Sequence, residues 1–320
     1  MHQPCPYPSA AHCTVGAYVL SPPLIEAYGW PFVFIAYGGI GGLLAVLWGV
    51  WGADQPVEQS VVIANQPAGQ AVVIAAPAAK VAAAEALEAS EASEASEAAE
   101  AAGAAEAEVP WAQILSSRPV WALAAAHSSH NFFTYFGLSW LPTYFSYQFG
   151  LSAADASSAA LFPFIAGAVG SLTAGAACDA LVARAGFSLT DARKAMQSVA
   201  LGGPLLAMSF LAVLSAGVGG MQLTRDEAEA LFVTSIGLSA FSAAGFGCGA
   251  QDISTRLSSL LYGGTSVFAV VAGASGQYFT GWLLEANGRD FTPMFVLVAV
   301  IETVGLIAWN SWWSSERSFE

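Results

Sequence analysis

Long runs of apolar residues dominate the chain and predict an all-α membrane protein. Six runs reach the roughly 20 mostly apolar residues that a helix needs to cross a bilayer. They cover residues 31–52, 119–145, 157–178, 196–220, 230–251 and 258–284, and a seventh run, 291–313, is interrupted by Glu302. The runs leave almost no polar face for water, which argues against the buried helices of a large soluble protein.

Two further patterns indicate how these helices pack and lie in the membrane. Gly167, Ser171 and Gly175 lie four residues apart, and such small residues let helix backbones approach closely in lipid. Residues 9–27 resemble the end of another span, shortened by Pro22 and Pro23. If the connection 53–118 lies on the inner side, alternation places seven basic residues there and leaves Arg225 and Arg289 opposite: Lys80, Arg118, Arg184, Arg193, Lys194, Arg256 and Arg317.

Composition supports lipid as the main partner. Only 10% of the 320 residues are charged, against about 25% in an ordinary soluble domain. The net charge of −14 arises largely from one segment, since eight of the 23 acids fall between Glu85 and Glu108. We expect membrane lipid and no nucleic acid among the partners. The Glu-rich segment predicts a solvated tether, with a docking segment for a basic partner as the alternative.

The sequence contains no pattern typical of an enzyme or of a metal protein. The four cysteines are widely scattered, and the HxxH pair His127 and His130 has no Cys or carboxylate nearby in its span. No nucleophile and base constellation and no phosphate-cradling loop is present. We therefore expect neither catalysis nor a bound metal or cofactor.

Polar residues interrupt the apolar run "AAAHSSHNFFTYFGLSWLPTYF" at 124–145. His127, His130, Asn131 and Thr134 recur at three and four residues, so they share one side of a helix, with Tyr135 close by. Polar groups at bilayer depth usually face a bundle interior or a water-filled pathway. Histidine can donate from both ring nitrogens when protonated, which suits it to an anion. The alternative is that these side chains only bond neighbouring helices.

Several segments in order resemble the anion:cation symporters of the major facilitator superfamily, a family that includes sialin, the vesicular glutamate transporters and the plastid phosphate transporters. These segments are "SPPLIEAYGWPFVFIAYGGIG", "SRPVWALAAAHSSHNFFTYFGLSWLPTYF", "GAACDALVARAGFSLTDARKAMQSVALGGP" and "AGFGCGAQDIS". The resemblance implies twelve helices in two bundles. This chain matches the second bundle and about one and a half helices of the first, as in an N-terminally truncated member.

The resemblance also implies a domain organisation. Residues 1–52 correspond to the end of the first bundle, 53–116 to an Ala/Glu-rich loop, 117–313 to the C-terminal six-helix bundle and 314–320 to a tail. A partial major facilitator fold implies that the missing N-terminal bundle, or an intact homologue, is a partner. Plant-type similarity favours a plastid membrane, thylakoid or envelope, with a vesicular or plasma membrane as the alternative.

The resemblance implies a substrate site on the seventh span. His130 falls where vesicular glutamate members have a substrate-binding Arg and plant-type members have His, and Tyr135 matches a family Tyr. With His127 and Asn131, these residues are the expected anion contacts. Imidazole lacks the bidentate fork of guanidinium, which favours inorganic phosphate, coupled to Na⁺ or H⁺, over a glutamate-like or sialic-acid-like anion. The alternative is a transport-incompetent half-transporter that acts as a membrane interaction partner.

Charged residues at the helix ends are the expected gate. Gly175, Asp179 and Arg184 form a G-x-x-x-D-x-x-x-x-R pattern, and the resemblance implies that charge contacts here hold one conformation. We expect Arg184 or Arg193 to pair with Asp179. Asp252 and Arg256 form a similar pair, for which a local i,i+4 ion pair is the plainer interpretation. We expect a neutral Glu302 on the bundle surface.

Overall fold

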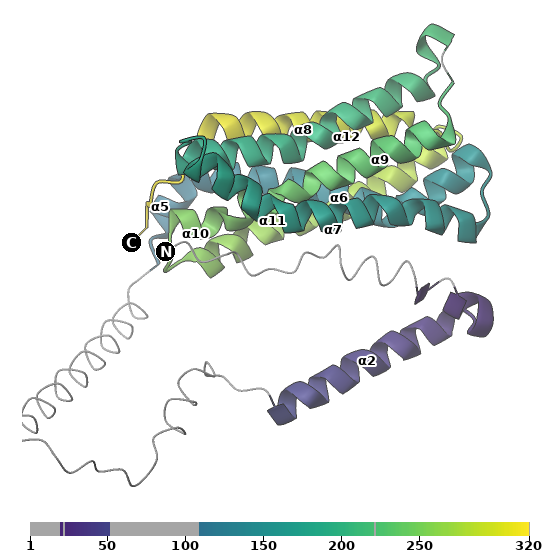
Figure 1. The fold of residues 1–320 in the computed structure, drawn as a ribbon, viewed down its shortest axis with the longest axis horizontal. Helices are drawn as coiled ribbons and strands as arrows, with labels where there is room; N and C mark the ends of the chain where they lie inside the picture. The colour runs from purple at the N-terminus through teal and green to yellow at the C-terminus, as the bar shows by residue number, and fades with distance from the viewer. Residues whose placement is uncertain (1–19, 22, 52–108, 221, 320) are drawn as a thin grey trace, which may run out of the picture. The chain divides into compact units, whose positions relative to one another are not determined.

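The computed structural model describes residues 20–21, 23–51, 109–220 and 222–319 (Figure 1). The chain divides into two units, one formed by residues 28–109 and one that contains residues 110–320. Each unit is described by itself. The predictions for residues 1–19, and for the Glu-rich segment within 52–108, lie outside the described residues.

The helix described in the first unit is α2, Trp30–Trp51, which matches residues 31–51 of the predicted span 31–52. Most of its large apolar side chains are exposed, including Phe34, Leu44 and Trp48. An exposed apolar helix of this length requires either lipid or another helix around it.

The second unit is a bundle whose long helices lie side by side (Figure 1). Its α-helices are α5 (Trp111–Ser116), α6 (Arg118–Phe149), α7 (Ala153–Ala183), α8 (Leu189–Ser215), α9 (Arg225–Ser239), α10 (Gly249–Ile253), α11 (Ser258–Ala286) and α12 (Thr292–Trp312). Three 3₁₀ turns, η1 (Val218–Gly220), η2 (Ala240–Ala243) and η3 (Phe246–Cys248), complete it. The expected all-α fold is confirmed.

Among the described residues, six helical stretches are long and apolar enough to cross a membrane, which makes the chain a multi-pass membrane protein. They are α2, α7, α8, the stretch from α9 to α10, α11 and α12. The helix α6 is not in this group although the sequence predicts a span at 119–145. Its polar residues between His127 and Thr134 lower its mean hydropathy, and it packs against α7, α8, α9, α11 and α12 in the bundle.

Local signals at the helix ends explain where the helices begin and end. Gly150 has φ 66° and ends α6, a left-handed conformation that glycine adopts without strain. The hydroxyls of Ser152 and Ser188 accept hydrogen bonds from the third residue of α7 and α8. Thr224 and Glu227 form a reciprocal capping box at the start of α9.

The close contact between α7 and α9 uses Gly167 from the predicted pattern, together with Gly170, which the pattern did not include. A Cβ atom on Gly170 would collide with the carbonyl oxygen of Gly237, and one on Gly167 would lie 3.1 Å from Ile236. A Cβ on Gly175 would meet nothing within 4 Å. Positions four apart drift around a helix of 3.6 residues per turn, so Ser171 and Gly175 leave the contact that Gly167 and Gly170 make.

One end of the bundle carries most of the positive charge. Ser315 N–H donates to Thr190 at 3.0 Å and Ser318 N–H to the Ile253 carbonyl at 3.0 Å, which places the start of α8, the end of α10 and the chain after α12 together. Six of the eight basic residues in this unit lie at or near that end: Arg118, Arg184, Arg193, Lys194, Arg256 and Arg317. The excess matches the expected inner side of the membrane.

Glu302 lies inside the bundle and not on its surface, so the sequence interpretation of this residue is wrong. It is 1% exposed, on the stripe of α12 that also carries the buried Val298, Gly305 and Trp309. This stripe packs against α6 and α8, and the Ser129 hydroxyl of α6 donates to the Ile301 carbonyl at 3.0 Å. The helical period therefore places Glu302 between three helices.

Candidate functional site

Two histidines of α6 meet aromatic and hydroxyl side chains from other helices. The buried ring of His127 stacks on Phe246 with ring centroids 4.6 Å apart, and its second ring neighbour is Tyr262 at 5.2 Å. His127 Nδ1 lies 3.4 Å from the Thr265 hydroxyl of α11. His127 is therefore held by contacts with two other parts of the bundle.

His130 occupies the same neighbourhood one turn further along α6. Its ring centroid is 5.4 Å from that of Phe246, and its Nε2 lies 3.4 Å from the hydroxyls of both Thr134 and Ser242. Its Nδ1 is buried and has no hydrogen-bond partner among the described residues. A buried polar nitrogen without a partner is energetically unfavourable, so this atom is available to a ligand.

The two other expected substrate contacts, Tyr135 and Asn131, do not share the surroundings of the two histidines. The Tyr135 ring packs against Gly273 of α11 so closely that a Cβ atom there would come within 2.5 Å of it. Asn131 is partly exposed and makes no hydrogen bond to a described residue. The structure thus brings His127 and His130 together around Phe246, while Tyr135 is directed to α11.

The histidines face a break in the span from α9 to α10. The helix changes to 3₁₀ turns at 240–248, and Gly245 has φ −89° and ψ −111°. The broken helix leaves backbone groups without their usual partners, and such breaks occur in membranes only where protein or water satisfies them. The sequence run 230–251 gave an uninterrupted helix, so the break is a finding of the structure.

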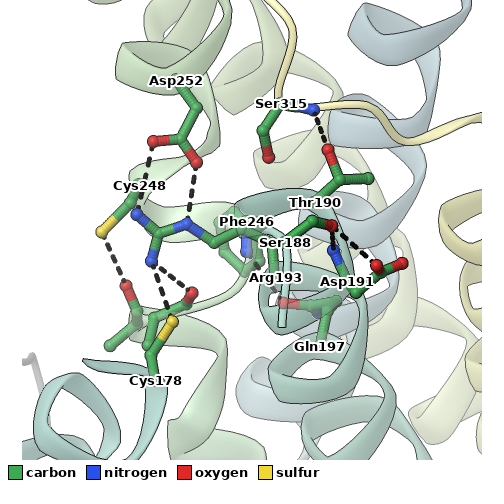
Figure 2. A network of polar contacts seen from close by, with 12 residues as sticks. Cys178, Ser188, Thr190, Asp191, Arg193, Gln197, Phe246, Cys248, Asp252 and Ser315 are labelled. Carbon is green, nitrogen blue, oxygen red and sulfur yellow. Dashed lines mark hydrogen bonds and ion pairs between the residues drawn. The ribbon is translucent and has the colours of Figure 1, made fainter. Parts of the chain in front are cut away.

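Gln197 of α8 stabilises this break. Its side chain is fully buried, and its Oε1 accepts a hydrogen bond from the backbone N–H of Phe246 at 3.0 Å (Figure 2). A Cβ atom on Gly245 would collide with the same oxygen, so only glycine fits beside it. The sequence analysis missed Gln197, although a single amide side chain within the apolar run 196–220 is a signal of buried polar contact.

Removal of the Gln197 amide should lower the melting temperature of the detergent-purified protein. We expect Gln197→Leu to cost about 1–3 kcal/mol, because it leaves the buried Phe246 N–H without an acceptor. The matched control is Gln148→Leu on the exposed end of α6, which should shift stability by less than about 0.5 kcal/mol. Equal melting temperatures for the two variants would contradict this role of Gln197.

An ion pair closes the basic end of the bundle next to the break. Arg193 Nε donates to Asp252 Oδ2 at 2.8 Å and Nη2 to Asp252 Oδ1 at 3.3 Å. Nη1 donates to the Ala244 carbonyl at 2.8 Å and contacts Cys178 Sγ at 3.5 Å. Figure 2 shows the guanidinium between Asp252 and Cys178. We call Arg193, Asp252, Cys178 and Ala244 the arginine clasp, since Arg193 joins α7, α8, α10 and the end of η2.

The clasp corrects the predicted charge pairs. Arg193 pairs with Asp252, not with Asp179. Asp179 and Arg184 are exposed and make no ion pair with a described residue. Five residues along a helix place two side chains on nearly opposite faces, so these two cannot meet.

The second predicted pair, Asp252 with Arg256, does not lie on one helix. The helix α10 ends at Ile253, and Ser254 has φ −158° and ψ 126°. Asp252 and Arg256 are therefore not on one helix, so the helical i,i+4 spacing does not apply to them. Asp252 instead bonds with a residue 59 positions earlier in the chain.

The site contains polar groups of several kinds. Within the described ranges, no three His, Cys, Asp or Glu side chains gather closely enough to hold a metal. The buried cysteines Cys178 and Cys248 are free thiols. The geometry thus offers two imidazoles, several hydroxyls and a nearby ion pair at a helix break.

Comparisons with known proteins agree with this architecture. The family described as Major Facilitator Superfamily matches residues 13–269. The chain is 29% identical over 307 residues to "Probable anion transporter 4, chloroplastic" of Oryza sativa subsp. japonica, which covers 96% of this chain and 46% of that relative. It is 28% identical to "Sodium-dependent phosphate transport protein 1, chloroplastic" of Arabidopsis thaliana, covering 95% of this chain and 52% of the relative.

A third relative broadens the range of named substrates. The chain is 28% identical to "Ascorbate transporter, chloroplastic" of Arabidopsis thaliana, over 95% of this chain and 49% of that protein. The chain spans about half the length of these curated relatives. The relatives are named for transport of different anions, so their names alone do not identify one substrate.

Proposed function

Because the chain belongs to the major facilitator superfamily, we propose that it provides one helical bundle of a secondary transporter for a small anion. Inorganic phosphate is the favoured substrate, and Na⁺ or H⁺ is the coupling ion. Such transporters alternate access by rocking two bundles around a site near the bilayer midplane. The names of the relatives support a plastid membrane as the location.

The observation that carries the proposal is the environment of His130. An imidazole nitrogen that is buried without a partner, beside Ser242 at a helix break, can bond an anion oxygen. The neighbouring hydroxyl of Thr134 can act as a second donor. A compact oxyanion suits this arrangement. The imidazole and the hydroxyls each offer one hydrogen bond from a different direction, whereas a flat carboxylate is best bound by the two parallel donors of a guanidinium.

The arginine clasp is the proposed latch of this transporter. Asp252 and Arg193 hold the end of the broken span against α8, and their separation would free that end. The proposal also keeps three residues as weaker contacts of the anion: His127, Asn131 and Tyr135. Tyr135 would act through the contact between α6 and α11. We also keep four other residues as proposed parts of the end of the bundle that moves, because of where they lie and not because of the pairs first expected: Gly175, Asp179, Arg184 and Arg256.

Uptake by reconstituted protein tests the proposal. A form that contains both bundles, reconstituted in liposomes, should take up labelled phosphate when a Na⁺ or H⁺ gradient is imposed. We expect His130→Ala to reduce uptake about tenfold or more, because a charge-assisted hydrogen bond contributes about 1.5–3 kcal/mol and 1.4 kcal/mol is tenfold. Ser139→Ala, an exposed polar change on the same helix, is the matched control.

The outcomes of this experiment separate the alternatives. If His130→Ala leaves phosphate uptake unchanged, His130 does not bind the substrate and the proposed site is wrong. Uptake of ascorbate without uptake of phosphate would replace the substrate by an organic anion. If this chain alone transports neither anion, the alternative of an interaction partner is favoured, and co-expression with an intact relative tests that role.

A further inference from the structure

A groove on another side of α6 is separate from the histidine site. Its volume is about 650 Å³, within the range of about 300–1,000 Å³ typical of ligand sites. The residues that line it are Arg118, Trp121, Ala124, Ala125, Ser128, Phe268 and Trp312. They come from α6, α11 and α12, and none of them contributes to the arginine clasp or contacts His130.

The groove follows α6 from Arg118, its first residue, to Ser128. The ten helical steps from Arg118 to Ser128 rise about 15 Å along α6, which is half of the roughly 30 Å hydrocarbon core. Arg118 begins α6 and Trp312 ends α12, both at the basic end of the bundle. Phe268 lies equally far along α11, which starts at Ser258 at the same end. The groove therefore has the length of one leaflet.

The walls of the groove suit an acyl chain and remain uncovered within the bundle. Trp121, Phe268 and Trp312 are 42%, 52% and 46% exposed, although each is a large apolar side chain. The Trp121 ring lies 5.8 Å from Phe268, and its Nε1–H donates to the Leu115 carbonyl at 2.8 Å, which fixes its orientation. Small side chains at Ala124, Ala125 and Ser128 form the floor.

The mouth of the groove suits an anionic headgroup. Arg118 is exposed, and no described carboxylate pairs with it. Arginine binds phosphate oxygens through two parallel N–H donors, and tryptophan is enriched at the headgroup level of membranes. Basic pockets between transmembrane helices on the positive side of a protein bind anionic lipid headgroups.

We propose that this groove binds one anionic phospholipid, with its phosphate on Arg118 and one acyl chain between Trp121, Phe268 and Trp312. The lipid covers the apolar walls that the bundle leaves exposed. Binding here would favour the α6–α11–α12 packing, and the site is independent of the transported anion.

Native mass spectrometry of the detergent-purified chain tests this binding. The probes are phosphatidylglycerol and phosphatidylcholine with identical acyl chains. We expect about a five-fold preference for phosphatidylglycerol, as the roughly 1 kcal/mol per basic residue near an anionic surface implies. Arg118→Gln should abolish this preference. Arg225→Gln, which removes an equal charge at the opposite end, should leave it unchanged.

Two further measurements keep the proposal falsifiable. Ala125→Phe should fill the floor and reduce retention of both lipids, and thermal melting verifies that the variant folds. Excess inorganic phosphate should not displace the lipid, because the acyl chain supplies most of the contact. Three results would each overturn the proposal. The unmodified protein could retain the two lipids equally, Arg118→Gln could keep the preference for phosphatidylglycerol, or inorganic phosphate alone could displace the lipid.

Discussion

Replacement of Arg193 by alanine should lower the free energy of unfolding by about 3–5 kcal/mol, since it leaves the carboxylate of Asp252 without its partner in a site that is 11% exposed. Arg193 also donates to the Ala244 carbonyl, so the variant removes the contacts that join the broken span to α8. Arg193→Lys should give an intermediate loss, because a single ammonium cannot reproduce the fork on both carboxylate oxygens. Unfolding of the purified protein in mixed detergent measures these differences.

A double-mutant cycle isolates the ion pair from the other effects of the substitution. Asp252→Ala in the Arg193→Ala background should cost much less than in the unmodified protein, with a coupling energy of about 2 kcal/mol or more. The matched control is the pair Arg225 and Glu229, 3.9 Å apart with Arg225 46% exposed. That pair should show about 0.5 kcal/mol or less. Additive effects of the two clasp substitutions would contradict the latch.

Tyr144→Ala should also destabilise the bundle by about 3–5 kcal/mol, the cost of truncating a buried aromatic side chain. Tyr144 is fully buried at the end of the bundle opposite the clasp. Its ring lies within 6.0 Å, centroid to centroid, of five phenylalanines from α6, α9 and α12 or its start: Phe145, Phe149, Phe232, Phe291 and Phe295. The ring therefore joins three helices.

Tyr144→Phe should have a different effect from Tyr144→Ala. The Tyr144 hydroxyl has no hydrogen-bond partner among the described residues, so its removal should be neutral or stabilise by about 1 kcal/mol. Tyr147→Ala is the surface control, because Tyr147 is 48% exposed and contacts Arg289 through a cation–π interaction at 4.8 Å. Its loss should be about 1 kcal/mol or less. A large destabilisation by Tyr144→Phe would show that the hydroxyl is bonded.

The sequence predicted the helices well because apolar length is a local property. Each predicted run corresponds to helical structure, and the observed α6 extends from Arg118 to Phe149 where the run gave 119–145. The break at 240–248 was not predicted, since alanine, glycine and phenylalanine also occur in unbroken spans. The three glycines Gly245, Gly247 and Gly249 were the available signal.

Contacts between distant residues account for what the sequence could not predict. Local spacing suggested Asp179 with Arg184 and Asp252 with Arg256, whereas packing of α8 against the broken span brings Arg193 to Asp252. The buried position of Glu302 depends equally on which stripe of α12 meets α6 and α8. By contrast, His130 was predicted to face inward from spacing and resemblance, and its role in binding stays a prediction.

The attachment of the broken span to α8 has a mechanical consequence. Gln197 bonds Phe246, and Arg193 bonds both Ala244 and Asp252, so the second and third turns of α8 hold the segment 244–253 at two levels. The segment is separated from α9 by turns that bend more easily than a continuous helix. We therefore expect α8 and this segment to shift as one rigid lever while the arginine clasp is closed, with 240–243 as its hinge.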